Sequence, residues 1–452
     1  MKITKHILIP IAIGTASFTL NNYLAAQETE FKPSGNLYGY AFGDWANKSH
    51  YDTLQRGGGN VQYKGLTPLS TGNAVAANNP VNNALSTQTN AFQIRRMYLG
   101  YDYKFAPNFS ASVLLANEQN VDGGGKNTVY VKYVNVKCSN IFKLKNTDLV
   151  IGQYGTCSFA NAGNTEPLYG YRSIERTIMD LHNTDGSTDM GASLQGKIWS
   201  QRVADSLKPM YIGYALQVGN NGGATPYASA NFKKTRANVF VSALKQKLTV
   251  GLYGDYLVQQ QTPYVTSNMT MKFYAAYATE WFRVGAEVFQ QTNKNSDIYK
   301  VSANGVIPAG TVNDTASGVQ MGWSVFASGQ ILKNKLNVFA RLDRYNPNTK
   351  FNNNNVYSKA YSGITGSNLT SATFYTQTFY TAGIDWTPNP RIHIMPNIWY
   401  NGYKAMMSTS GAGGTGSDLG ARVKNDKDLV YRLTFYFIFN GSKKVANNGM
   451  AN

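Results

Sequence analysis

The chain has 452 residues, a formal net charge of +18 and only 15% charged residues, with 31 Tyr, 21 Phe and 43 Gly. Its two cysteines are too few for a disulfide framework, and its four histidines stand apart, so no His/Cys metal site is indicated. The lysines are dispersed and no nucleic-acid-binding module is recognisable, which argues against nucleic acid as the partner of the basic charge. A chain of this length could form one or two globular domains or a membrane β-barrel.

Residues 1–26 are typical of a secretory signal peptide. Lys2 and Lys5 precede an apolar run from Ile7 to Leu20, and small residues end the segment before Gln27. We expect cleavage there, which leaves a mature chain with a net charge of +16 (18 minus 2). No later segment has the ~18 consecutive apolar residues of a transmembrane helix.

Alternation of polar and apolar residues between turn residues predicts sixteen strands in the rest of the chain. They are expected at about 35–45, 92–104, 108–116, 128–138, 147–154, 189–199, 209–218, 236–245, 247–258, 269–279, 281–291, 318–329, 335–344, 374–386, 391–402 and 428–440. Most are close to the ~9–11 residues that a tilted strand needs to cross a bilayer. The sequence therefore predicts an all-β fold, a transmembrane antiparallel β-barrel of about 16 strands over residues 27–440, followed by a polar tail at 441–452.

The connections between these strands are alternately short and long. Short turns are expected at 106–108, 139–146, 200–208, 245–247, 279–281, 332–335 and 388–391. Long polar stretches lie at 46–91, 117–127, 155–188, 219–235, 259–268, 292–317, 345–373 and 403–427. Outer-membrane barrels have short periplasmic turns and long external loops, whereas a β-sandwich has no reason to sort its loops in this way.

One face of several predicted strands carries positive charge. An unpaired charge is very costly in a packed core, but it is natural in a water-filled lumen. Alternation places six cations on the lumen wall: Arg96, Lys132, Lys272, Arg283, Arg341 and Arg432. Glu287 and Asp343 fall on the same faces as Arg283 and Arg341, so both neutralising pairs and an anion-attracting field are open at this point.

The stretch YGYRSIERTIMD, residues 169–180, differs from its surroundings. Ile174, Ile178 and Leu181 recur at helical spacing, which indicates a short helix-like segment in a strand-rich chain. The stretch also brings four charged residues together: Arg172, Glu175, Arg176 and Asp180.

Three stretches resemble the phosphate-selective porin O and P family of bacterial porins: IRRMYLGYDYKFAPNFS (94–110), LVIGQYG (149–155) and the segment 171–198. In that family a strand ending in Gly-Gln-aromatic leads into a loop with Glu-Arg and then into a Gly-rich strand. Here these motifs are 152–154, Glu175-Arg176 and 189–196. The chain differs from the family directly after the first motif, where residues 155–158 read GTCS in place of Lys and Pro.

The resemblance implies a homotrimeric porin in the outer membrane of a Gram-negative bacterium, in contact with lipid and lipopolysaccharide. It also implies that the third external loop, residues 155–188, folds into the barrel. Arg172, Glu175, Arg176 and Asp180 would then lie at a pore constriction, where guanidinium groups attract anions and bind phosphate or carboxylate. Pairing of these charges with one another is the alternative.

The expected function is passive diffusion of small hydrophilic solutes, with a preference for anions and with no cofactor and no enzymatic activity. One alternative is a narrow or closed barrel whose long external loops at 46–91, 345–373 and 403–427 bind a surface ligand or partner. Another is a barrel esterase that uses His182 with Ser173 or Ser187. Cys138 and Cys157 should lie at opposite ends of their strands, so free thiols are predicted.

Overall fold

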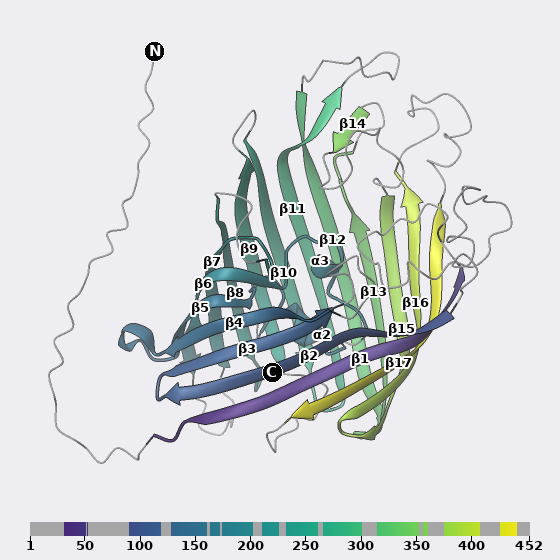
Figure 1. Cartoon of the computed structure of the whole chain (residues 1–452). Coiled ribbons are helices and arrows are strands. Elements are labelled where there is room, and N and C mark those ends of the chain that lie inside the picture. The colour runs from purple at the N-terminus through teal and green to yellow at the C-terminus, as the bar shows by residue number, and fades with distance from the viewer. Residues whose placement is uncertain are drawn as a thin grey trace, which may run out of the picture.

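The computed structural model describes residues 31–50, 52, 90–118, 128–160, 163–171, 174–201, 210–225, 232–260, 265–300, 314–351, 356–359, 375–406 and 425–440. Sixteen strands in these residues form one closed antiparallel barrel (Figure 1). The predicted signal peptide and the polar tail lie outside the described residues.

The barrel strands are β1 (Ser34–His50), β2 (Asn90–Ala106), β3 (Phe109–Glu118), β4 (Tyr130–Ser139), β5 (Thr147–Gly155), β6 (Thr188–Gln201), β7 (Met210–Gly219), β8 (Lys234–Ala243), β9 (Leu248–Gln260), β10 (Thr266–Ala278), β11 (Phe282–Lys300), β12 (Asp314–Leu332), β13 (Leu336–Asn346), β15 (Tyr375–Asn389), β16 (Ile392–Ala405) and β17 (Asp426–Asn440). The short strand β14 (Val356–Lys359) pairs with the end of β11. A 3-10 turn, η2 (Ile141–Lys143), lies between β4 and β5.

All sixteen predicted barrel strands are present, so the predicted fold class is confirmed. The largest difference is at β11, which runs to Lys300 instead of ending near residue 291. It is longer because its end continues to pair with β12, where Asp297 faces Ala316, and also with β14. The connections are short at one end of the barrel and long at the other, as the sequence predicts.

The barrel closes where β1 pairs with β17. Tyr40 lies opposite Ile438 and Lys48 opposite Val430 in this antiparallel ladder. Closure leaves no free strand edge, which a sheet in lipid requires because no water is present to satisfy its backbone groups. None of the helices among the described residues has the length and apolar character needed to cross a membrane.

Side chains alternate between a lipid-facing and an inward face, as β17 illustrates. Tyr431, Leu433 and Phe437 are exposed on the outside, whereas Arg432 and Thr434 are buried inside. Pro396 on β16 faces outward opposite Leu433. The exposed large apolar residues would be unfavourable in water, but they suit contact with acyl chains.

A β-bulge changes the alternation at the doublet Arg95-Arg96. Phe42 pairs with Arg96 and Gly43 with Ile94, so Arg95 is an extra residue in β2. Both arginines are consequently buried inside the barrel. Strict alternation would have placed Arg95 in lipid, at a cost of about 2–4 kcal/mol near the midplane, and the bulge removes that conflict.

Cys138 and Cys157 are free thiols, as predicted. The thiol of Cys157 is fully buried beside loop and wall residues.

Replacement of outward-facing Leu342 tests the assignment of faces. Leu342 is 41% exposed on β13, between the buried residues Arg341 and Asp343. We expect Leu342→Arg to lower the free energy of unfolding by about 2–4 kcal/mol, because a guanidinium is poorly solvated in lipid. Equilibrium unfolding in urea from lipid vesicles measures this change. Leu342→Ala is the control, and an equal effect of the two substitutions would contradict a lipid-facing position.

Candidate functional site

The long connection between β5 and β6, residues 156–187, enters the barrel and is called loop 3 here (Figure 1). It contains two short helices, α2 (Thr165–Tyr169) and α3 (Ile178–Leu181). Its two ends are held together because the Thr156 amide donates to the Ser187 carbonyl at 3.1 Å and the Thr156 hydroxyl donates to the Gly186 carbonyl at 2.6 Å.

The helix-like segment predicted at 169–180 is wrong for most of its described length. Gly170 has a left-handed conformation with φ 74° and ends α2. Helix α3 begins only after Thr177, whose side chain accepts from the Asp180 amide. The described residues between the two helices are instead bound to the barrel wall. Arg172 lies outside the described residues.

Lys272 of β10 holds the first limb of loop 3. Its ammonium donates to the Ser158 carbonyl, to Asn164 Oδ1 at 2.7 Å and to Thr165 Oγ1 at 3.2 Å. Glu287 Oε2 lies 3.6 Å away and supplies the opposite charge. A buried ammonium is stable only with such partners, so this lysine and the loop conformation depend on each other.

Strand β11 holds helix α2 and the chain that follows it. The Tyr169 hydroxyl donates to Glu287 Oε1 at 2.5 Å, and Arg283 Nη1 donates to the Pro167 carbonyl at 3.2 Å. Gly170 is favoured here because its positive φ disfavours other residues. A Cβ at this position would also require the Arg283 guanidinium to shift.

Two arginines from opposite sides of the closure bind the middle of loop 3. Arg95 Nη1 and Arg432 Nη1 donate to the Ile174 carbonyl at 3.0 and 3.2 Å. Arg95 Nε also lies 3.2 Å from Asp44 Oδ2. The Ile174 side chain packs among buried rings that include Phe42.

Glu175 is bound to the barrel wall and to the backbone of its own loop. Its Oε2 accepts from Trp399 Nε1 at 2.7 Å, and its Oε1 accepts from the Arg176 amide at 2.9 Å. Burial acts to raise the pKa of this carboxyl, but Arg432 and Arg95 outweigh burial and leave the pKa below its ordinary value. Glu175 is therefore charged in the assembled loop.

Arg176 and Asp180 form a looser pair at the same level. Arg176 Nη1 lies 3.8 Å from Asp180 Oδ1, and both side chains are about 15% exposed. The Arg176 carbonyl accepts from Arg341, whose guanidinium also pairs with Asp343 at 2.5 Å. The neutralising pair that the sequence left open for Arg341 is thus present, whereas Glu287 pairs with Lys272 and not with Arg283.

The return limb is fixed by a buried cluster around Asp185. Arg236 donates to both carboxylate oxygens of Asp185, at 2.8 and 2.9 Å, and Lys234 donates to it at 3.0 Å. Arg236 also binds Asp189 at 2.7 Å. Burial acts to raise the pKa of the Asp185 carboxyl, but Arg236 and Lys234 outweigh it, so the pKa lies well below its ordinary value.

All six predicted lumen-wall cations point inward, and each has a polar partner. Lys132 Nζ and Arg96 Nη1 lie 2.7 and 3.5 Å from Glu118 Oε1, and the partners of the other four are given above. Arg432 also donates to Asn397 Oδ1 at 2.6 Å. Within the described residues, no three His, Cys, Asp or Glu side chains lie close enough to hold a metal ion.

Alternation alone did not identify Arg95 or the Asp185 cluster. The doublet of two arginines in one strand is a usable signal for Arg95, because both cannot face inward without a bulge. Asp185 lies in loop 3, Asp189 at the start of β6, and Arg236 in β8, 51 residues after Asp185. No periodic pattern connects them.

No family model and no curated protein sequence matches the chain. Solved structures do resemble its fold. The outer membrane channel DcaP of Acinetobacter baumannii has 10% identity and a TM-score of 0.51, over 92% of this chain and 100% of that one. The anion-selective porin from Comamonas acidovorans has 10% identity and a TM-score of 0.49, over 90% and 100% of the two chains.

At this identity the comparison with DcaP establishes the fold alone: a closed sixteen-stranded antiparallel barrel of the kind found in outer-membrane channels. The apolar outer face of the strands agrees with a place in the outer membrane.

Removal of the Asp185 charge tests how firmly loop 3 is held. Asp185→Asn leaves Arg236 and Lys234 buried without their shared carboxylate, which should destabilise the inserted loop by about 3–5 kcal/mol. We expect protease cleavage within 156–187 to become faster. Asp180→Asn is the matched control, because the partly exposed Arg176–Asp180 pair should contribute less than about 1 kcal/mol. Equal protection of Asp185→Asn and the wild type would contradict an anchoring role.

His182 makes the packing of loop 3 sensitive to acid. Its ring stacks on Tyr345 with centroids 3.4 Å apart, and burial together with Arg341 lowers its pKa below the ordinary 6.5. If loop 3 is released, His182 regains its ordinary pKa and takes up a proton below about pH 6.5. In the packed loop the imidazole stays neutral at the same pH, so packing weakens as the pH falls. We expect faster protease cleavage of the loop at pH 5 than at pH 7.5. His182→Phe keeps a ring and should reduce the difference in cleavage rate between the two pH values. An unchanged difference in this variant would show that other groups cause the pH dependence.

Proposed function

We propose that this protein is an outer-membrane porin through which small hydrophilic solutes diffuse passively. The observation that carries the proposal is the contrast between the two faces of the closed barrel. Large apolar side chains are exposed outside, while Lys, Arg, Asp, Glu, Asn and Thr side chains line the inside. Such an interior suits water and polar solutes, and such an exterior suits lipid.

We also propose that loop 3 narrows the passage. In support, its backbone carbonyls are bound by cations from β2, β10, β11, β13 and β17. Glu175 and Arg176 lie beside the bound carbonyls of Ile174 and Arg176, and Asp180 lies 3.8 Å from Arg176. On this basis the proposal puts all three at the constriction, with Arg176 and Asp180 the more exposed and Glu175 buried against Trp399. The same position is proposed for Arg172.

A weak preference for anions is part of the proposal. The net charge of +16 expected for the mature chain (18 minus 2) attracts anions toward the protein. Among the described residues, however, nine buried Lys and Arg side chains accompany ten buried Asp and Glu side chains. The field inside this part of the lumen is therefore nearly balanced, and the preference should be small. Phosphate is the first anion to test, because the motif resemblance is to phosphate-selective porins. The same resemblance underlies the proposal of a homotrimer.

Conductance across a planar lipid bilayer tests the porin proposal directly. We expect stepwise current increases when purified protein is added. The narrow or closed barrel with ligand-binding external loops is the second candidate, and it is favoured by the deep burial of inward residues around loop 3. Complete absence of steps from correctly folded protein would support that candidate over a porin.

Reversal potentials in a salt gradient test the anion preference. We expect a small potential of the sign that indicates anions in the wild type, and a shift toward cations for Arg176→Ala, since the substitution removes one positive charge beside the passage. Lys145→Ala is the control, because Lys145 is an exposed residue in the short turn between β4 and β5. Cation preference in the wild type would contradict the proposed anion preference. A reversal potential in Arg176→Ala equal to that of the wild type would contradict the placement of Arg176 beside the passage.

A further inference from the structure

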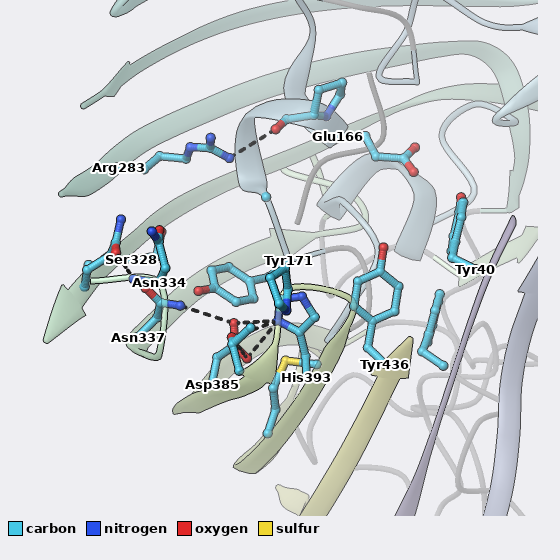
Figure 2. Close-up of a pocket in the computed structure, with 18 of the residues that line it drawn as sticks. Tyr40, Glu166, Tyr171, Arg283, Ser328, Asn334, Asn337, Asp385, His393 and Tyr436 are labelled. Carbon is cyan, nitrogen blue, oxygen red and sulfur yellow. Dashed lines mark hydrogen bonds and ion pairs between the residues drawn. The ribbon is translucent and has the colours of Figure 1, made fainter. Parts of the chain in front are cut away.

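A cavity of about 380 Å³ lies between loop 3 and the short turns of the barrel (Figure 2). Its roof is formed by loop 3, including Glu166, Pro167 and Tyr171, and its lower rim by turn residues such as Trp281 and Asn334. This volume falls in the range of roughly 300–1,000 Å³ that is usual for small-molecule sites. Neither the Arg176–Asp180 pair nor the Asp185 cluster lines this cavity.

Aromatic rings form one wall of this cavity. The rings come from four neighbouring or closing strands and from loop 3: Tyr38, Tyr40, Phe42, Tyr98, Tyr133, Tyr171 and Tyr436. Tyr40 packs against Tyr98 with centroids 4.6 Å apart and against Tyr436 at 6.1 Å. These contacts fix the rings, while Tyr38, Tyr40, Tyr133 and Tyr171 remain only partly buried.

His393 contributes a polar atom beside these rings. Its Nδ1 lies 3.0 and 3.1 Å from the two oxygens of Asp385, and its ring centroid is 5.3 Å from that of Tyr436. Asp385 is only 2% exposed and also accepts a hydrogen bond from Asn337 at 3.5 Å. The carboxylate therefore holds the imidazole in one orientation (Figure 2).

The second nitrogen of His393 has no partner. His393 is only 8% exposed, and its Nε2 is buried without a hydrogen bond. Because a carboxylate only accepts, Nδ1 carries a hydrogen, and in the tautomer whose single ring hydrogen is on Nδ1, Nε2 is an acceptor. A buried acceptor without a partner costs free energy, so a ligand that donates a hydrogen bond would be favoured at this position.

Charge around the cavity favours a neutral ligand. Lys132 and Arg283 are its cations, and Glu166, Glu280 and Asp385 are its carboxylates. Lys132 is paired with Glu118 at 2.7 Å, and Arg283 donates to the Pro167 carbonyl. An anion would thus meet no excess positive charge and would face an acceptor at His393.

We propose that this cavity is a binding site for a neutral sugar, a solute with hydroxyl donors and apolar C–H faces. The C–H face of a sugar ring lies on the partly exposed rings of Tyr40 and Tyr171, and a sugar hydroxyl donates to His393 Nε2. The inference rests on the proposed function only in that the solute enters through the barrel. It names a solute class that the porin proposal leaves open.

The test uses maltose as the probe and gluconate as a matched polyhydroxylated anion. Binding to folded protein in detergent is followed by calorimetry, and block of single-channel current is followed in a bilayer. We expect maltose to bind more tightly than gluconate. His393→Phe retains a ring but not the acceptor and should weaken maltose binding about 5-fold, in line with one lost hydrogen bond. Tyr40→Leu should weaken it by a similar factor through loss of the ring face. Lys145→Ala, at an exposed turn position outside the cavity lining, is the control.

The outcomes separate this inference from the porin proposal. Maltose binding without current steps would support the site and contradict the porin. Current steps with no maltose binding, with tighter binding of gluconate, or with unchanged affinity in both His393→Phe and Tyr40→Leu would support the porin and overturn the site. Each variant is checked by gel electrophoresis with and without heating. A change in mobility on heating like that of the wild type confirms that the barrel is folded, so a loss of affinity reports on the cavity.

Discussion

Closure of β1 on β17 is the constraint on which the rest of this structure depends. In lipid, every backbone N–H and C=O group needs a partner within the sheet, and only a closed barrel supplies one for each strand edge. Once the edges are joined, the two faces of each strand are separated for its whole length. The outer face can then be apolar and the inner face charged, as Leu433 and Arg432 are on β17.

A charged inner wall creates a second constraint, because a buried guanidinium or ammonium needs a partner. In this barrel loop 3 provides many of those partners as backbone carbonyls. Arg95 and Arg432 share the carbonyl of Ile174, and Lys272 binds the Ser158 carbonyl. The wall cations hold the loop, and the loop satisfies the wall cations. This mutual dependence also limits how much positive field remains inside the barrel.

Loop 3 also lines the cavity that lies between it and the short turns of the barrel. Tyr171 lies on the loop and lines the cavity, which Asp385 also lines. Asp385 in turn orients His393, and Arg283 reaches the loop backbone from β11. A change in the position of the loop would therefore alter the cavity. Tyr171, one of its aromatic rings, would move together with the loop residues Glu166 and Pro167 that cover it.

The sequence by itself determined the barrel, because a two-residue period and the alternation of short and long connections are local features that each strand carries independently. The inward direction of Arg341 and Arg432 follows from the same period. Tertiary structure decided the rest. The bulge at Arg95, the bond from Trp399 to Glu175 and the cluster of Asp185 with Arg236 each join residues from separate segments. The described residues between α2 and α3 are not helical, although the apolar spacing suggested a helix, because contacts with the wall outweigh the weak propensity of so short a segment.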